Sequence, residues 1–306
     1  MNISYVFLIG FSTASLELFP YAGDELHTEV GKMVFTKSLG EGDFGAVFRA
    51  DWKTGGRPVA LKVAKPSSLN DIDRKSLPVS DYGEITHEYR MMSLLSKSHG
   101  FPRIYTKNFE GYYKYYAMQL LGKDLFTLWR EYDSKMPTSL VISIAGQILN
   151  RLEDIHRLGY LMYDLHLGNF VLDDGIVYAI DLGMAFPYLV DGKHIEFGES
   201  FLPQKYKHRK LSSRRDSEGF MVSRRDEMER FLYLLVTLNV GSLPWEKSRD
   251  IVFRKRTATL DEICKGNADW LKPAFRYVLR MRFDEKPNYD KFRKFFDITS
   301  QKLMKH

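Results

Sequence analysis

The sequence predicts an α+β protein of two lobes, the first rich in strands and the second helical. Short apolar runs broken by glycine turns fill residues 33–121, whereas long segments with apolar residues every three or four positions follow residue 122. A length of 306 residues with 44% hydrophobic and 27% charged residues is typical of a globular protein and excludes the disordered and low-complexity classes. We expect a ligand site in the cleft between the lobes.

The first lobe is predicted as an antiparallel sheet with one helix. A turn at residues 53–57 joins its second and third strands into a hairpin. After a polar loop, the spacing of Tyr89, Met92 and Leu95 indicates a helix. In chain order we expect strands 34–42, 45–52 and 58–65, the loop 67–80, the helix 84–96, and strands 103–106 and 112–121.

The second lobe is predicted as mainly helical. A long amphipathic helix begins at Ser139 and ends near Gly159, because Leu140, Ile144 and Ile148 recur at helical spacing. Two short strands and three further helices follow. We expect strands 170–172 and 177–180 and helices 227–238, 270–281 and 289–296.

Residues 1–32 are predicted as an N-terminal arm. The apolar run at residues 5–11 is far shorter than the roughly 20 residues that a membrane-spanning helix needs, so no membrane span is expected. It is long enough for the core of a secretory signal, but no Lys or Arg precedes it. A cleaved signal and an arm packed on the body both stay open. The lone Cys264 favours a reducing compartment, and we expect the cytoplasm or the nucleus.

A glycine-rich turn lies between the first two predicted strands. Residues 39–47 read LGEGDFGAV, and the spacing G-x-G-x-x-G is a weak signal alone. Because the chain continues as a strand, we interpret the turn as a hairpin lid over phosphates and not as a dinucleotide-binding loop. Lys62 in the third strand lies among apolar residues, and a buried lysine needs an anion. Glu88 is its candidate protein partner, and the phosphates of ATP are the candidate ligand.

Carboxylate and amide side chains occur at matching positions in the second lobe. Asp164 and Asn169 lie five residues apart in the loop after the long helix, and Asp181 begins an Asp-x-Gly sequence twelve residues later. Such oxygen ligands suit Mg²⁺ bound to a triphosphate. Each residue taken singly is more often a turn or cap residue. Their order after the glycine hairpin and Lys62 nevertheless predicts a nucleotide site.

With these residues in place, the sequence resembles a eukaryotic protein kinase over residues 35–296. Three blocks are similar to the casein kinase 1 family and its vaccinia-related and tau-tubulin kinase cousins: SRRDEME at 223–229, GSLPW at 241–245 and RFDEKPNY at 282–289. The resemblance implies the two-lobed protein kinase fold, with a kinase domain over residues 33–300 that divides into an N-lobe, 33–121, and a C-lobe, 122–300. It also implies an ATP- and Mg²⁺-dependent protein serine/threonine kinase that acts as a monomer on protein substrates.

The resemblance assigns roles to the residues at matching positions. Asp164 would accept the proton of a substrate hydroxyl, Asn169 and Asp181 would bind Mg²⁺, and Lys62, held by Glu88, would bind the α- and β-phosphates. The hinge pattern LGKDL at 121–125 implies that Met118 is the gatekeeper and that residues 119–121 are the hinge that faces the adenine. The implied nucleotide-binding residues are Leu39, Gly40, Glu41, Gly42, Asp43, Phe44, Gly45, Ala46, Val47, Lys62, Glu88, Met118 and Leu121.

Four residues near the catalytic loop depart from the pattern of the family. Met162 and Tyr163 stand where most kinases have His-Arg, which implies that phosphorylation of the activation loop is not the on-switch. His166 replaces the usual lysine, and a mostly neutral imidazole is a weaker partner for the γ-phosphate. Glu227 stands where an aspartate usually ties the helical lobe to the catalytic loop. These departures support an alternative, a catalytically weak or inactive pseudokinase that acts as an ATP-binding or scaffolding module.

A basic run lies between Asp181 and the SRRDEME block. Residues 205–215 hold six Lys or Arg and no acid, within a chain of net charge +6. Because the resemblance implies anion binding in this region, we predict a preference for acidic or already phosphorylated substrates. A solvated loop is the alternative. No nucleic-acid-binding module surrounds the run, so no specific nucleic acid is expected. The basic residues are Lys205, Lys207, Arg209, Lys210, Arg214 and Arg215.

Overall fold

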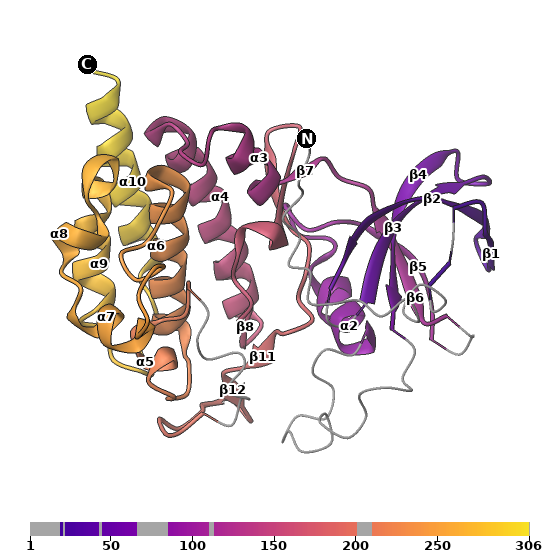
Figure 1. The fold of residues 1–306 in the computed structure, drawn as a ribbon. Coiled ribbons are helices and arrows are strands. Elements are labelled where there is room, and N and C mark those ends of the chain that lie inside the picture. The colour runs from indigo at the N-terminus through magenta and orange to yellow at the C-terminus, as the bar shows by residue number, and fades with distance from the viewer. Residues whose placement is uncertain are drawn as a thin grey trace.

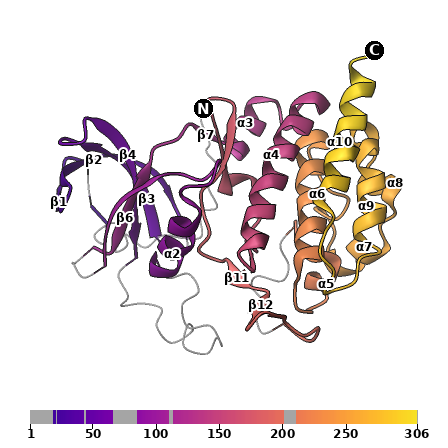
Figure 2. The ribbon, with the colours of Figure 1, turned by 180° about the vertical axis from the view of Figure 1, so that it is seen from behind.

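The predicted α+β architecture is confirmed by the computed structural model, which describes residues 19–20, 22–42, 45–65, 85–109, 113–200 and 210–305. Figure 1 shows a curled sheet with one helix on the right and a larger bundle of helices on the left, and Figure 2 shows both from behind. None of the helices in the described ranges is long and apolar enough to cross a membrane.

The sheet of the first lobe is antiparallel throughout. Within the described residues it has six strands in the order β1-β2-β3-β4-β6-β5. Strand β1 (Glu25–Thr28) pairs with β2 and lies inside the predicted N-terminal arm, whereas residues 1–18, which hold the apolar run, lie outside the described residues. The other strands are β2 (Gly31–Glu41), β3 (Gly45–Trp52), β4 (Arg57–Ala64), β5 (Ile104–Asn108) and β6 (Tyr115–Gln119).

Alternation along β4 separates the two faces of this sheet. Val59, Leu61 and Val63 are fully buried in one apolar cluster, together with residues of β2, β3 and β6. Ala60 belongs to a second cluster that includes Ile85, the first residue of helix α2 (Ile85–Leu95). Because side chains alternate along a strand, Lys62 shares a face with Ala60 and is directed to the side on which α2 packs.

The second lobe is built around helix α6 (Arg224–Val240), which is buried along most of its length. Ser223 and Asp226 form a capping box at its start, and Gly241 ends it with a φ of 96°. These caps explain why the helix extends beyond the predicted 227–238, since they satisfy backbone groups outside the apolar repeat. Helices α4 (Thr138–Arg157) and α10 (Tyr289–Leu303) contribute to the same core.

Short elements complete the second lobe. Helix α3 (Leu125–Glu131) has no predicted counterpart, although Asp124 caps it by accepting a hydrogen bond from the N–H of Thr127 at 2.9 Å. The predicted helix 270–281 is instead a 3₁₀ turn, η4 (Gly266–Leu271), followed by α9 (Lys272–Val278). The remaining elements are β7 (Lys123–Asp124), β8 (Tyr160–Leu161), η2 (Leu167–Asn169), β9 (Phe170–Asp173), β10 (Ile176–Ala179), β11 (Phe186–Pro187), β12 (Leu189–Val190), β13 (Lys193–His194), α5 (Arg214–Ser217), α7 (Ile251–Thr257) and α8 (Leu260–Ile263).

Candidate active site

A buried lysine joins two carboxylates from different parts of the chain. The Nζ atom of Lys62 on β4 lies 2.6 Å from the carboxylate of Glu88 on α2 and 3.0 Å from Oδ2 of Asp181, which follows β10. The hydroxyl of Tyr116 on β6 donates to Glu88 at 2.7 Å. The structure thus brings together the three residues that the sequence placed around phosphates, and Tyr116 is a further member that the sequence reasoning missed.

Burial and neighbouring charges both shift the pKa values of Lys62, Glu88 and Asp181. For Lys62, burial lowers the pKa, but Asp181 and Glu88 outweigh it and raise the pKa above its ordinary value. Burial and the negative charge of Asp181 raise the pKa of Glu88 to about 7, against the effect of Lys62. Burial also raises the pKa of Asp181, yet Lys62 and the N–H of Gly183 lower it below its ordinary value. Lys62 therefore stays charged and Asp181 stays an anion.

The loop between β8 and β9 holds Asp164 and Asn169. The amide nitrogen Nδ2 of Asn169 donates to the carbonyl of Asp164 at 2.8 Å, which leaves the Oδ1 atom of Asn169 for another ligand. The N–H of Ile180 donates to the carbonyl of Asn169 at 3.0 Å, so the following residue, Asp181, lies beside the loop. A carboxylate and an amide oxygen suit Mg²⁺.

This donor set fits a cation that is also held by phosphate oxygens. In the described part of the chain, no group of three or more His, Cys, Asp or Glu is arranged to hold a metal. Asn169 and Asp181 alone do not complete the octahedral coordination that Mg²⁺ demands, and in proteins Mg²⁺ commonly takes substrate phosphates and water as its other ligands. The residues present therefore fit Mg²⁺ together with ATP.

His166 lies next to Asp164. Its Nδ1 atom accepts a hydrogen bond from the N–H of Gly168 at 3.1 Å, so the proton of the neutral ring is on Nε2. Nε2 lies 3.5 Å from Oδ2 of Asp164. Burial lowers the pKa of His166, although Asp181 and Asp124 oppose this effect. The imidazole that stands in place of the usual lysine is thus neutral near pH 7 and lies next to the carboxylate of Asp164, at a distance longer than an ordinary hydrogen bond.

The glycine-rich turn is the end of the β2–β3 hairpin. The N–H of Gly42 donates to the carbonyl of Gly45 at 2.8 Å, and Glu41 lies 3.3 Å from Lys65. A Cβ atom on Gly45 would stand 2.3 Å from the carbonyl oxygen of Val63, so this position requires glycine. Gly40 lies within the hairpin, whereas Asp43 and Phe44 lie outside the described residues.

An apolar cluster lies on the Lys62 face of the sheet. Met118 is buried beside Ala60, and Val47 and Leu120 pack against the same cluster. Leu121 is half-buried and Leu39 is exposed. Ala46 belongs to the cluster on the opposite face of the sheet, because its neighbour Val47 takes the Lys62 face. Of the predicted nucleotide-binding residues with apolar side chains, the structure therefore brings Val47 and Met118 together in this cluster, and Ala46, Leu39 and Leu121 lie outside it.

Glu227 anchors the catalytic loop from helix α6. Its carboxylate accepts hydrogen bonds from the N–H of Tyr163 at 2.7 Å and from the N–H of Met162 at 3.2 Å. It also lies 2.7 Å from Nε2 of His156, whose Nδ1 atom lies 2.7 Å from the hydroxyl of Tyr289. The longer glutamate thus ties the helical lobe to the loop at the position where the resemblance implies an aspartate.

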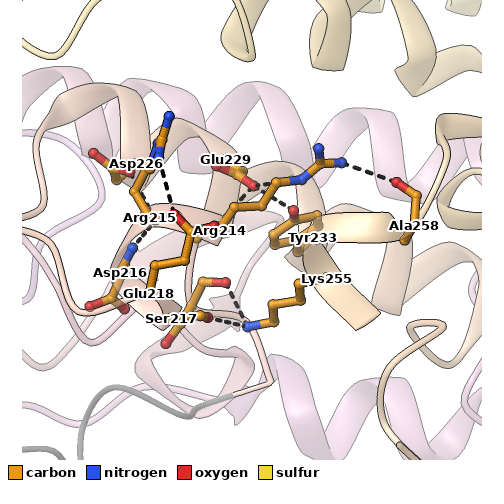
Figure 3. A network of polar contacts seen from close by, with 12 residues as sticks. Arg214, Arg215, Asp216, Ser217, Glu218, Asp226, Glu229, Tyr233, Lys255 and Ala258 are labelled. Carbon is orange, nitrogen blue, oxygen red and sulfur yellow. Dashed lines mark hydrogen bonds and ion pairs between the residues drawn. The ribbon is translucent and has the colours of Figure 1, made fainter. Parts of the chain in front are cut away.

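The basic run is only partly described. Lys205, Lys207 and Arg209 lie outside the described residues. Lys210 lies 3.0 Å from Glu246, and Arg215 lies 3.1 Å from Glu218. Arg214 lies 3.6 Å from Glu229 and donates to the carbonyl of Ala258 at 3.3 Å, as Figure 3 shows. Each described member of the run therefore has an acidic neighbour in the chain.

Comparison with known proteins agrees with this geometry. The protein kinase domain family matches residues 33–197. "Casein kinase I homolog 3" of Schizosaccharomyces pombe is 27% identical over 293 residues, which cover 89% of this chain and 62% of that protein. "Casein kinase 1-like protein HD16" of Oryza sativa subsp. japonica is 28% identical over 276 residues, which cover 85% of this chain and 38% of that protein.

The chain belongs to the protein kinase family. Within that family it is a divergent relative of the casein kinase 1 proteins, which confirms the resemblance seen in the sequence. The chain spans only part of the length of these two relatives.

Proposed function

We propose that this protein is an ATP- and Mg²⁺-dependent protein serine/threonine kinase of the casein kinase 1 type. The observation that carries the proposal is the contact of Lys62 with both Glu88 and Asp181, next to the loop of Asp164 and Asn169. Phosphoryl transfer requires mainly positioning and charge neutralisation, and this group supplies both.

Each residue has a separate task in the proposed reaction. Lys62 binds phosphate oxygens, and Glu88 holds its ammonium group in place. Asn169 and Asp181 offer the oxygen ligands for Mg²⁺, which neutralises the charge on the phosphates when it is bound. Asp164 orients the hydroxyl of the substrate and accepts its proton as the hydroxyl oxygen bonds to the γ-phosphorus of ATP, while the bond between that phosphorus and the bridging oxygen breaks and ADP leaves with the electron pair. The backbone of the glycine hairpin covers the phosphates.

The departures from the family pattern have counterparts in the structure that favour activity over a pseudokinase. Glu227 makes the anchoring hydrogen bonds to the loop that an aspartate would make. His166 lies next to Asp164, with Nε2 3.5 Å from its carboxylate. The contacts of Lys62 with Asp181 and of Asn169 with Asp164 support the proposal that the groups for metal, phosphate and hydroxyl act together.

Radiolabelled ATP separates the two candidate functions. We expect the wild-type protein to label a casein-type substrate, and Asp164→Asn and Asp181→Asn to lower the rate at least 100-fold. Asp174→Asn is the matched control, because Asp174 is exposed at the β9–β10 turn with a φ of 47°, which asparagine tolerates. Thermal stabilisation of the wild-type protein by Mg²⁺-ATP without transfer would instead identify a pseudokinase.

We further propose that acidic or already phosphorylated proteins are the substrates. The support is the basic run with its Lys205, Lys207 and Arg209, since Lys210 is already neutralised by Glu246. We expect kcat/KM for a peptide with a phosphoserine N-terminal to the target serine to exceed that for its unphosphorylated form. Glu246→Gln should widen this ratio by releasing the charge of Lys210. Equal rates on acidic and basic peptides would contradict the proposal.

A monomer that acts in the cytoplasm or the nucleus completes the proposal. The free, buried Cys264, which is ordinary in a reducing compartment, supports the cytoplasm or the nucleus, whereas the monomer is proposed from the sequence alone. Analytical ultracentrifugation and imaging of a tagged full-length protein in its own host test the two statements.

A further inference from the structure

The residue before Asp164 has an uncommon backbone conformation. Tyr163 has a φ of 62°, and the N–H of Asp164 donates to the carbonyl of Met162 at 2.8 Å across it. This is a three-residue γ-turn with a non-glycine residue at positive φ, which is strained and persists only where the surroundings hold it. The position of Asp164 therefore depends on the contacts that keep the backbone of Tyr163 in this conformation.

Two residues of helix α6 hold the backbone of Tyr163. The N–H of Tyr163 donates to Glu227, and its carbonyl accepts a hydrogen bond from Nη1 of Arg230. The guanidinium of Arg230 also lies over the ring of Tyr163, 4.4 Å from the ring centroid. Since Glu227 and Arg230 are three residues apart on one helix, they share a face and contact the turn together.

Arg230 is in turn held from the other side by Asp216. The two side chains form a buried ion pair, with 5% of Arg230 and none of Asp216 exposed. Asp216 belongs to the short helix α5, whose N-cap Ser213 donates to Asp226 at 2.9 Å, one turn before Arg230 on α6. Figure 3 shows Asp216, Ser217 and Glu218 of this segment beside Asp226 and Glu229 of α6. Arg230 thus bridges α5 and the catalytic loop.

We propose that Arg230 is a positioning residue for the catalytic base. It holds the Tyr163 carbonyl in the γ-turn, and Asp216 holds Arg230, so the segment that follows the basic run is linked to Asp164. Because Asp216 is part of the chain, the link needs no phosphate on the protein. This inference rests on the proposed kinase function, which gives Asp164 its role.

Three variants separate positioning from general stability. Arg230→Met removes the link but leaves Asp216 as an unpaired buried charge, which destabilises the fold. The double variant Arg230→Met/Asp216→Asn also removes that charge. Arg151→Met is the matched control, because Arg151 is 4% exposed and donates to a carbonyl, that of Val177, away from the catalytic loop.

The variants are compared by kcat, KM for ATP, melting temperature and amide hydrogen exchange. We expect Arg230→Met to lower kcat about 100-fold with KM for ATP within twofold, because a shift of the base by about 1 Å has that effect on rate. The double variant should regain melting temperature but not kcat. Arg151→Met should lose melting temperature and keep kcat within threefold.

The exchange measurement tests the link without relying on activity. We expect peptides that cover residues 160–169 to exchange faster in both Arg230 variants than in the wild-type protein, and to keep their rate in Arg151→Met. Wild-type exchange rates in the Arg230 variants, or recovery of kcat together with melting temperature in the double variant, would overturn the inference. A wild-type protein that transfers no phosphate would refute the proposed function, and the exchange result would then decide the inference alone.

Discussion

Replacing Glu227 by glutamine changes one oxygen of a buried carboxylate into an NH₂ group. In the wild-type protein this carboxylate accepts from the N–H groups of Met162 and Tyr163 and lies beside His156. Glutamine keeps one acceptor oxygen, which can serve Tyr163. The NH₂ group then takes the place of the oxygen that accepts from the N–H of Met162, so this N–H faces another donor.

The expected loss of stability follows from these contacts. A buried N–H without an acceptor costs about 1–3 kcal/mol, and exchanging a charged acceptor for a neutral one weakens the bond to Tyr163 by about 1 kcal/mol. The free energy of unfolding should therefore fall by about 2–4 kcal/mol. At about 2–4 °C per kcal/mol, the melting temperature should fall by about 4–16 °C.

The same substitution should lower activity. The γ-turn at Tyr163 loses part of its anchor, so Asp164 moves and kcat should fall by about 10- to 100-fold while KM for ATP stays close to the wild-type value. Urea denaturation and steady-state kinetics measure the two effects. Glu218→Gln is the control, because its pair with Arg215 is at the surface and should change the free energy of unfolding by less than about 1 kcal/mol.

A Glu227→Gln protein as stable as Glu218→Gln would refute this reasoning. It would mean that the carboxylate does not bind the catalytic loop as the distances indicate. Wild-type kcat in a destabilised Glu227→Gln protein would instead show that the anchor supports the fold and not the position of Asp164.

Three further predictions concern other parts of the molecule. Burial and a neighbouring arginine lower the pKa of Lys255 to about 7, against 10.5 for a free lysine. Between pH 7 and 10.5 the unfolded state therefore binds more protons at Lys255 than the folded state does, so the free energy of unfolding should rise between pH 7 and 9. Urea denaturation of Lys255→Met should show a smaller rise than that of the wild-type protein. Gly45→Ala should weaken the thermal stabilisation by ATP, because its Cβ would stand 2.3 Å from a carbonyl oxygen of β4. Gly146→Ala in α4 is the control: its Cβ meets nothing within 4 Å, so the melting temperature should stay the same or rise. His166→Ala should lower kcat by less than about tenfold at unchanged KM for ATP, because a distance of 3.5 Å between Nε2 and the carboxylate of Asp164 allows only a weak interaction. A loss of about 100-fold or more would contradict this reasoning.

Much of the nucleotide side of the site could be predicted from local patterns. The glycine spacing in a strand–turn–strand context required a hairpin lid, and a lysine among apolar strand residues required an anion. The contacts of Lys62 with Glu88 and Asp181 agree with the second expectation, and the pairing of β2 with β3 agrees with a hairpin. The motif includes both Ala46 and Val47 among the nucleotide-binding residues. Adjacent residues of a strand point to opposite faces, so only Val47 lies on the Lys62 face of the sheet.

The charged residues outside these patterns could not be assigned in advance. Lys210 belongs to the same basic run as Lys205, and the sequence alone does not show that it lies 3.0 Å from Glu246 in the fold. The apolar repeat of the helix that contains Arg230 does not indicate which acidic or carbonyl group this arginine binds. In the fold, Arg230 contacts the carbonyl of Tyr163 and the carboxylate of Asp216. Each of these pairs joins residues that are distant along the chain.

The two-lobed α+β fold, the glycine hairpin between β2 and β3 and the buried position of Lys62 are therefore encoded in short stretches of sequence, because turn chemistry and hydrophobic periodicity act between near neighbours. The partners of Glu227, Arg230 and Lys210 became known only from the folded chain. A hydrogen bond or an ion pair depends on the distance between two groups, and for Glu227 and Arg230 the packing of α6 against the loop of Asp164 sets that distance.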